Sequence, residues 1–178
     1  MERTVELGSW GELYVMLGTS SAALIGLLLV AASLHLADLQ KNSGYRTRAR
    51  YNNYFLLLTL VEAAAILVPQ PLTALGAELA IANLFMFLIT FRVVYRFVLQ
   101  RPELGKRGGY SVSRSAAFLF AFLAGAAGGT LLFFKFFIGL YIVTAGYVVV
   151  IVTAADNAWA IMAGTGGGAR RPSNRQRK

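Results

Sequence analysis

Long runs of apolar residues, separated by short polar segments, dominate the pattern along the chain. A bilayer core of about 30 Å needs roughly 20 mostly apolar residues in an α-helix, because a helix satisfies its backbone hydrogen bonds within one segment. Five runs qualify. They predict an all-α integral membrane bundle of five transmembrane helices, spanning about residues 12–36, 51–68, 72–97, 115–134 and 136–162.

The last two predicted spans follow each other almost without a polar break. A single helix from residue 115 to residue 162 would exceed the thickness of any membrane. Lys135 lies near the middle of this stretch, so we expect a tight turn there. Residues 1–163 are then one transmembrane domain, and residues 164–178 form a separate tail.

Basic residues gather in three segments, and the count of spans decides whether those segments share one side. Lys and Arg are retained on the cytoplasmic side of short loops. Three segments share that side only if the number of spans is odd, which predicts an external N-terminus and a cytoplasmic C-terminus. The residues are Lys41, Arg46, Arg48 and Arg50 after the first span, Arg96, Arg101, Lys106, Arg107 and Arg114 after the third, and Arg170, Arg171, Arg175, Arg177 and Lys178 in the tail.

Composition supports lipid as the main partner of the chain. The 178 residues are 57% hydrophobic and only 14% charged, with a formal net charge of +9. Nucleic-acid binding needs basic residues gathered on one soluble face, whereas these lie between apolar runs, so we expect no nucleic-acid partner. The Gly- and Arg-rich tail is predicted to be disordered. It either attaches to anionic lipids, as the basic loops could also do, or simply fixes the topology.

Small residues recur every fourth position in two of the predicted spans. The positions are Gly18, Ala22 and Gly26 in the first span and Gly125 and Gly129 in the fourth. Such faces let helices approach closely in lipid, where hydrophobic attraction between helices is weak. They predict either packing within one chain or a seam between copies in a homo-oligomer.

Two glutamates fall inside predicted spans, where ionisable residues are costly and commonly functional. Glu62 and Glu78 are each eight residues from Gln70, so both carboxylates are expected roughly 12 Å below the connecting turn. Two carboxylates at one depth in a low dielectric cannot both stay ionised at low cost, which predicts a shared proton or cation. Asn83 and Thr59, about one turn deeper, are candidate neutral ligands. Alternatively, the glutamates face different ways, with Glu78 at the interface and Glu62 protonated and hydrogen-bonded.

A second polar group is predicted near the cytoplasmic ends of the helices. We expect an ion pair between Arg92 and Asp156, because an unpaired charge at this depth would be costly. His35 is expected at the interface, where its ordinary pKa would allow it to sense pH, and Asn157 lies beside Asp156. The group is interpreted either as a gate or as a structural clamp.

Two stretches carry a resemblance to known proteins. The first span closes with Gly26-Leu-Leu-Leu-Val-Ala-Ala-Ser-Leu-His-Leu, and the fifth closes with Asp156-Asn-Ala-Trp-Ala-Ile-Met. With these, the chain resembles small five-helix bacterial membrane proteins of unassigned function that have Asn-Ala-Trp near the end of the last helix. The resemblance covers most of the bundle and implies the same span count and a multi-pass location in the bacterial inner membrane. It implies no activity and transfers no functional residues.

The sequence bears on three classes of function: an enzyme, a channel or transporter, and an accessory subunit. An enzyme is not expected, because the chain has one histidine, no cysteine and no paired His-Glu motif from which a nucleophile or metal site is usually built; no cofactor or metal is expected either. The carboxylates favour a small cation or proton channel or transporter. The alternative is a non-catalytic accessory or regulatory subunit that binds another membrane protein.

Overall fold

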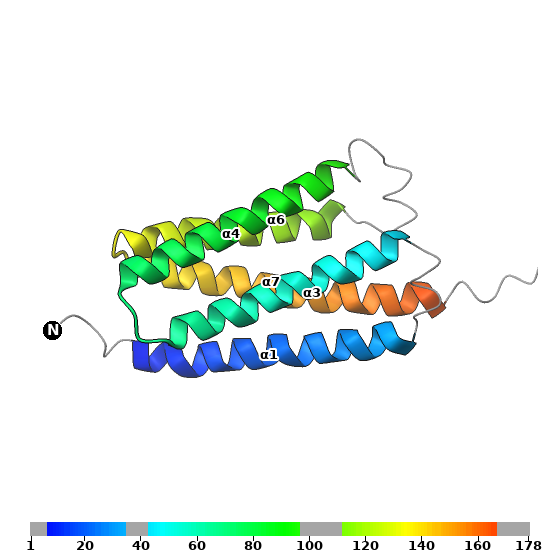
Figure 1. Ribbon diagram of the computed structural model, residues 1–178, viewed down its shortest axis with the longest axis horizontal. Coiled ribbons are helices and arrows are strands. Elements are labelled where there is room, and N and C mark those ends of the chain that lie inside the picture. Colours follow the sequence, from blue (N-terminus) through cyan, green and yellow to red (C-terminus); the bar gives the residue numbers. More distant parts are fainter. Residues whose placement is uncertain (1–6, 35–42, 97–111, 167–178) are drawn as a thin grey trace, which may run out of the picture.

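The computed structural model describes residues 7–34, 43–96 and 112–166, and these residues form five α-helices and no strand. In chain order the helices are α1 (Leu7–Leu34), α3 (Ser43–Leu67), α4 (Leu72–Val94), α6 (Val112–Phe133) and α7 (Ile138–Gly166). They lie along a common direction in one elongated bundle (Figure 1). The predicted all-α class and five long helices are therefore confirmed for the described residues, and that all five cross a membrane stays a prediction.

The helices begin and end a few residues away from the predicted spans. The largest difference is in α3, which begins at Ser43 rather than near residue 51. Nothing between these positions breaks a helix, and arginine is a good helix former, so the basic segment continues the helix as its first two turns. At the other end of the chain α7 extends to Gly166, so residues 164–166 are helical; the rest of the predicted tail lies outside the described residues.

Two tight turns connect neighbouring helices at one end of the bundle. Pro69, Gln70 and Pro71 join α3 to α4. Lys135 has a positive φ of 64°, and the backbone amides of Lys135 and Phe136 donate to the carbonyls of Leu132 and Leu131 at 2.8 and 2.9 Å, which ends α6 one residue earlier than predicted. We call this the turn end. The opposite end, the basic end, carries Arg46, Arg48, Arg50, Arg92, Arg96 and Arg114.

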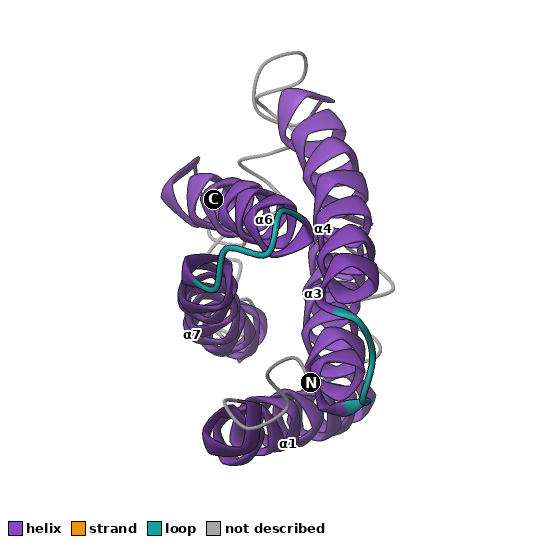
Figure 2. Cartoon of the chain, turned by 90° about the vertical axis from the view of Figure 1, so that its left-hand side faces the viewer, coloured by secondary structure: helices purple, strands orange, loops and turns teal. Residues whose placement is uncertain are grey.

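Helices that are consecutive in the chain pack together, except α3 and α4, which a tight turn joins but which contact each other less than α3 contacts α7. The α4–α6, α6–α7 and α1–α3 pairs have the most extensive contacts, and α3 also packs against α7. Seen from its end, α3 and α4 lie on one side of the bundle and α6 and α7 on the other, with α6 beside α4 and α1 beside α3 (Figure 2). Glycines permit the closest approaches, since a Cβ atom at Gly76 or Gly129 would overlap the backbone of the facing helix.

Four of the described helices are long and apolar enough to cross a membrane: Trp10–Leu34, Leu72–Val94, Ser113–Phe133 and Ile138–Trp159. The remaining helix, α3, has arginines and asparagines in its first half and falls short of that composition. Large apolar side chains are exposed over the bundle, including Ile81, Phe120 and Trp159. A soluble monomer rarely exposes so much apolar surface, so the helices fit a membrane-embedded protein.

The buried side chains form two apolar clusters along the bundle. One, nearer the turn end, contains Tyr14, Leu17, Ala63, Ile66, Leu75, Leu79, Leu132, Leu140, Val143 and Tyr147. The other, nearer the basic end, contains Leu28, Phe55, Leu56, Phe118, Ala121, Phe122, Val150, Ala154 and Ala158. Glu62, Thr59 and Asn83 are buried polar residues beside these clusters, which places the site inside the bundle.

Candidate functional site

Helix α3 buries several polar side chains against its neighbours, beside buried apolar residues such as Phe55 and Leu56. Arg48, Asn52, Thr59 and Glu62 are all at least nine-tenths buried, and their spacing of four, seven and three residues puts them on one face of a helix. On the opposite side Val61 is 62% exposed. Four buried polar side chains on one face, with an exposed valine on the other, are unusual for a soluble amphipathic helix.

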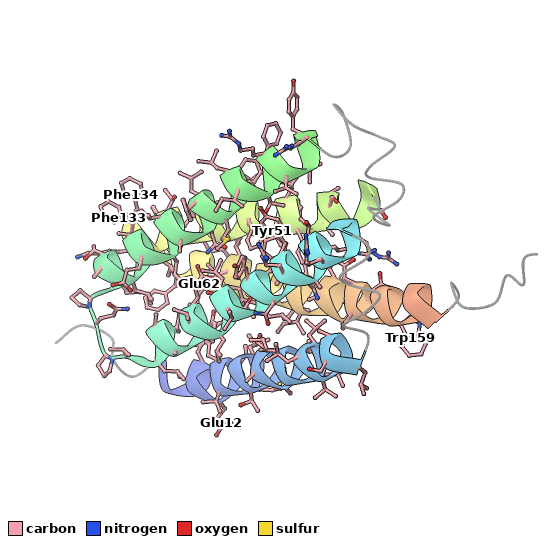
Figure 3. All side chains as sticks on the ribbon, turned by 45° about the vertical axis from the view of Figure 1, so that its right-hand side comes forward. Glu12, Tyr51, Glu62, Phe133, Phe134 and Trp159 are labelled. Carbon is pink, nitrogen blue, oxygen red and sulfur yellow. The ribbon has the colours of Figure 1, made fainter. Side chains whose placement is uncertain are left out.

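Glu62 is paired directly with Asn83 of α4. The Asn83 side-chain amide donates to Glu62 Oε1 at 2.7 Å and to the carbonyl of Leu79 at 2.9 Å, and both side chains are buried. Gly125 of α6 makes room for this arrangement, because a Cβ atom there would overlap the Asn83 amide. Figure 3 shows Glu62 between the helices and Glu12 on the outside of the bundle.

Two tyrosines lie next to the same carboxyl group. Tyr147 of α7 interacts electrostatically with Glu62 at close range, yet the Tyr147 hydroxyl and Glu62 Oε2 each lack a hydrogen bond of ordinary geometry. The ring of Tyr147 meets the ring of Tyr14 edge-on at 6.1 Å. Tyr14 of α1 in turn lies 2.7 Å from the Thr144 hydroxyl. The hydroxyl groups of Tyr147, Tyr14 and Thr144 therefore lie on the side of Glu62 that faces α7 and α1, and those of Tyr14 and Thr144 are hydrogen-bonded to each other.

All five helices contribute to this buried polar group. Asn83 comes from α4, Glu62 from α3, Tyr147 and Thr144 from α7, and Tyr14 from α1, while α6 supplies the space at Gly125. Chemically, a carboxyl oxygen without a hydrogen bond beside a hydroxyl group can exchange a proton with small movements. The tyrosines were missed by sequence reasoning; Tyr147 lies 12 residues after Lys135, a rise of roughly 18 Å that puts it near the depth of Asn83.

Glu78 does not join Glu62. Its side chain is exposed, and its Oε2 accepts a hydrogen bond from the Gln70 side chain at 3.1 Å. The depth of a residue in a helix does not determine which way its side chain faces. On α4, Asn83 faces α3, whereas Glu78 faces outward. Thr59 is buried, but its hydroxyl donates to the carbonyl of Phe55 one turn earlier in α3 at 3.1 Å, so its proton is used within its own helix.

At the basic end, the expected ion pair between Arg92 and Asp156 is wrong. Asp156 Oδ2 accepts from Nε of Arg114 instead. The reason is the packing order, since α7 lies against α6, which carries Arg114, whereas α4 lies on the far side of α6. Arg92 is exposed. His35 lies outside the described residues.

Asn157 has a partner that sequence reasoning missed. The Arg48 guanidinium group donates to Asn157 Oδ1, with Nε at 2.9 Å, and the Asn52 amide donates to the carbonyl of Ala154 at 3.0 Å. These contacts fasten the start of α3 to α7. The sequence analysis places Arg48 in a basic segment between spans. Its position four residues before Asn52 and eleven before Thr59 instead fits the buried face of α3.

The predicted packing residues fall into two groups. Gly18 faces Leu60 and Ala63 of α3, Gly125 faces Asn83, and Gly129 faces Ala80 and Gly76 of α4, so these three serve contacts within the chain. A Cβ atom at Gly26 would meet nothing within 4 Å, and Ala22 is exposed.

Within the described residues, no group of three or more His, Cys, Asp or Glu side chains is placed to hold a metal ion. Comparison with known proteins gives no match to any family model, curated protein or solved structure.

Proposed function

We propose that this chain is a multi-pass membrane protein that moves protons across the bilayer, with Glu62 as the group that binds and releases them. The observation that carries the proposal is a glutamate that is only 4% exposed, inside a bundle that exposes many large apolar side chains. One of its carboxyl oxygens is held by Asn83, and the other lacks a hydrogen bond. Ionisable groups at this depth usually serve transport.

The neighbours of Glu62 favour a proton over a metal cation. A hard cation takes about six oxygen ligands, whereas Asn83 presents its amide nitrogen to the carboxyl group and Thr59 is engaged with its own helix. A proton needs only one acceptor and a chain of hydroxyl groups. Tyr147, Tyr14 and Thr144 supply hydroxyl groups on the side of Glu62 that faces α7 and α1, from which such a chain could form with small movements of Tyr147.

The proposal includes the topology on which transport depends. In it α3 crosses the membrane with the four apolar helices, because its buried polar face and exposed apolar residues are compatible with lipid, as at Val61. The basic end then lies in the cytoplasm, beside anionic lipids, and the N-terminus lies outside. No enzymatic activity and no cofactor form part of the mechanism.

Proton flux into liposomes tests this function. Purified protein is reconstituted with a pH-sensitive dye inside the vesicles, and a potassium gradient with valinomycin supplies the driving force. Flux above that of empty liposomes is expected for the wild type, and Glu62→Gln, which keeps the shape and one carbonyl oxygen but cannot ionise, is expected to remove it. Glu78→Gln is the matched control and should conduct normally. Wild-type flux in Glu62→Gln, or none in the wild type, overturns the proposal.

An accessory role is the second candidate, supported by one feature of α1. Ala22 and Gly26 leave a small-residue surface open on the outside of the bundle, where another helix could approach closely. In that case the protein would conduct nothing alone. Co-purification with one stoichiometric membrane protein, lost in Gly26→Leu, would support this role in place of transport.

A further inference from the structure

A cavity of about 40 Å³ lies at the basic end of the bundle, between α3, α4, α6 and α7. It is separate from the polar group around Glu62, and none of that group lines it. Its walls combine guanidinium, amide and hydroxyl groups with aromatic rings. The lining residues that matter are Arg48, Asn52 and Phe55 of α3, Thr90 of α4, Arg114 and Phe118 of α6, and Asn157 of α7.

The charge of this cavity is positive. Two guanidinium groups, from Arg48 and Arg114, line it, and no acidic side chain is among its lining residues. Asp156 contacts Arg114 from outside the cavity wall. Arg48 is only 6% exposed, so its charge acts in surroundings that screen it weakly. Such a cavity favours an anion, and guanidinium groups match the geometry of phosphate oxygens especially well.

Two buried polar atoms in the wall lack a hydrogen bond. Thr90 Oγ1 has no partner although the residue is 4% exposed, and Asn52 Oδ1 has none although the residue is 1% exposed. Buried polar groups are nearly always paired with protein, water or a ligand. The Thr90 hydroxyl can donate to an oxyanion. Asn52 Oδ1 can accept from its protonated oxygen or from a water molecule beside it.

A second hollow of about 430 Å³ adjoins the cavity on the surface between α3 and α4. Arg50, Arg92 and Arg96 line it, and it shares Tyr51 and Val93 with the inner cavity. Clefts lined by one sign of charge raise the local concentration of the opposite ion. The three outer arginines can therefore draw an anion toward the inner pair.

We infer that the cavity lined by Arg48, Arg114, Thr90 and Asn52 is a binding site for an oxyanion of the phosphate class. Phosphate oxygens reach the site either as free inorganic phosphate or as the headgroup of an anionic lipid, whose chains would continue along the exposed apolar helices. The site does not depend on Glu62. Arg48 and Arg114, which take no part in the proposed proton pathway, would bind the anion.

Thermal unfolding of the full-length protein in neutral detergent tests the site. Inorganic phosphate is titrated against chloride at equal ionic strength, and phosphatidylglycerol is titrated against phosphatidylcholine. A ligand that binds the folded protein raises the unfolding temperature with concentration. A shift with phosphate identifies a soluble ion, a shift with phosphatidylglycerol alone identifies a lipid headgroup, and either supports the inference. The inference is overturned if phosphate shifts the unfolding temperature no more than chloride does, and phosphatidylglycerol no more than phosphatidylcholine.

Variants distinguish this cavity from general attraction to a basic surface. Thr90→Val removes the unpaired hydroxyl without changing the volume, and Arg114→Gln removes one guanidinium group; each should weaken binding about tenfold, as loss of a hydrogen bond to a charged group does. Arg46→Gln is the matched control. Arg46 is exposed, lies two residues before Arg48 in α3, and lines neither the cavity nor the outer hollow. An equal loss in Arg46→Gln, or unchanged binding in Thr90→Val, contradicts the site.

Discussion

Replacing Gly125 with alanine perturbs the buried carboxyl group from a third helix. A Cβ atom at this position would overlap the side-chain amide of Asn83. Asn83 would then have to turn away from Glu62, and the 2.7 Å hydrogen bond between them would be lost. Gly125→Ala therefore acts on Glu62 without touching it.

Three contributions set the size of the effect. Alanine in a helix interior is more stable than glycine by about 0.5–1 kcal/mol. Overpacking costs about 1–3 kcal/mol, and a buried polar group that loses its partner costs about 1–3 kcal/mol. The sum predicts a net loss of roughly 1–5 kcal/mol in the free energy of unfolding. Hydrogen bonds between helices in lipid average only about 0.6 kcal/mol, so we expect the lower part of this range.

A double-mutant cycle measures the effect, by reversible unfolding in mixed micelles. In an Asn83→Ala background the overlapping amide is gone, so Gly125→Ala should cost at least about 1 kcal/mol less than in the wild type. Gly26→Ala is the control, because its Cβ atom meets nothing within 4 Å, and it should be neutral or slightly stabilising. The reasoning is refuted if Gly125→Ala costs the same in both backgrounds, or if it behaves like Gly26→Ala.

Three further substitutions have defined outcomes. Tyr147→Phe removes a hydroxyl without a well-formed hydrogen bond, so it should change stability by less than about 1 kcal/mol while lowering proton flux in liposomes; unchanged flux would exclude Tyr147 from the pathway. Tyr14→Phe loses the contact with Thr144 and should cost about 1 kcal/mol in unfolding free energy, and no measurable cost would contradict that contact. Asp156→Asn breaks a half-exposed pair with Arg114 and should cost under about 1 kcal/mol, so a loss of several kcal/mol would show that the pair is buried.

The sequence predicts the helices far better than it predicts their contacts. Four of the five described helices follow from the length of their apolar runs, because a helix satisfies its backbone hydrogen bonds within one segment. The turn at Lys135 follows because the last two runs together are too long for one span. The predicted start of α3 near residue 51 is wrong, because the basic segment before it is helical from Ser43. Helix propensity and the continuing four- and three-residue spacing place Arg48 within α3.

The contacts depend on how each helix is rotated and on which helices are neighbours. Neither can be predicted from the depth of a residue in its helix. Glu62 and Glu78 are equally far from the turn, yet only Glu62 is buried. Asp156 pairs with Arg114 because α6 is the neighbour of α7. The sequence predicts Asn83 as a neutral ligand near Glu62. The role of Gly125 follows only from the packing of α4 against α6.

The claim on which the account depends is that α3 crosses the membrane with its polar face inward. The chain contains no cysteine, so single cysteines at Arg46, Val61 and Gln70 can each be labelled without background. A membrane-impermeant maleimide should react with Arg46→Cys from one side of the membrane only and with Gln70→Cys from the other only, and it should leave Val61→Cys unlabelled. Reaction of Arg46→Cys and Gln70→Cys from the same side, or ready labelling of Val61→Cys in the intact membrane, would contradict the account.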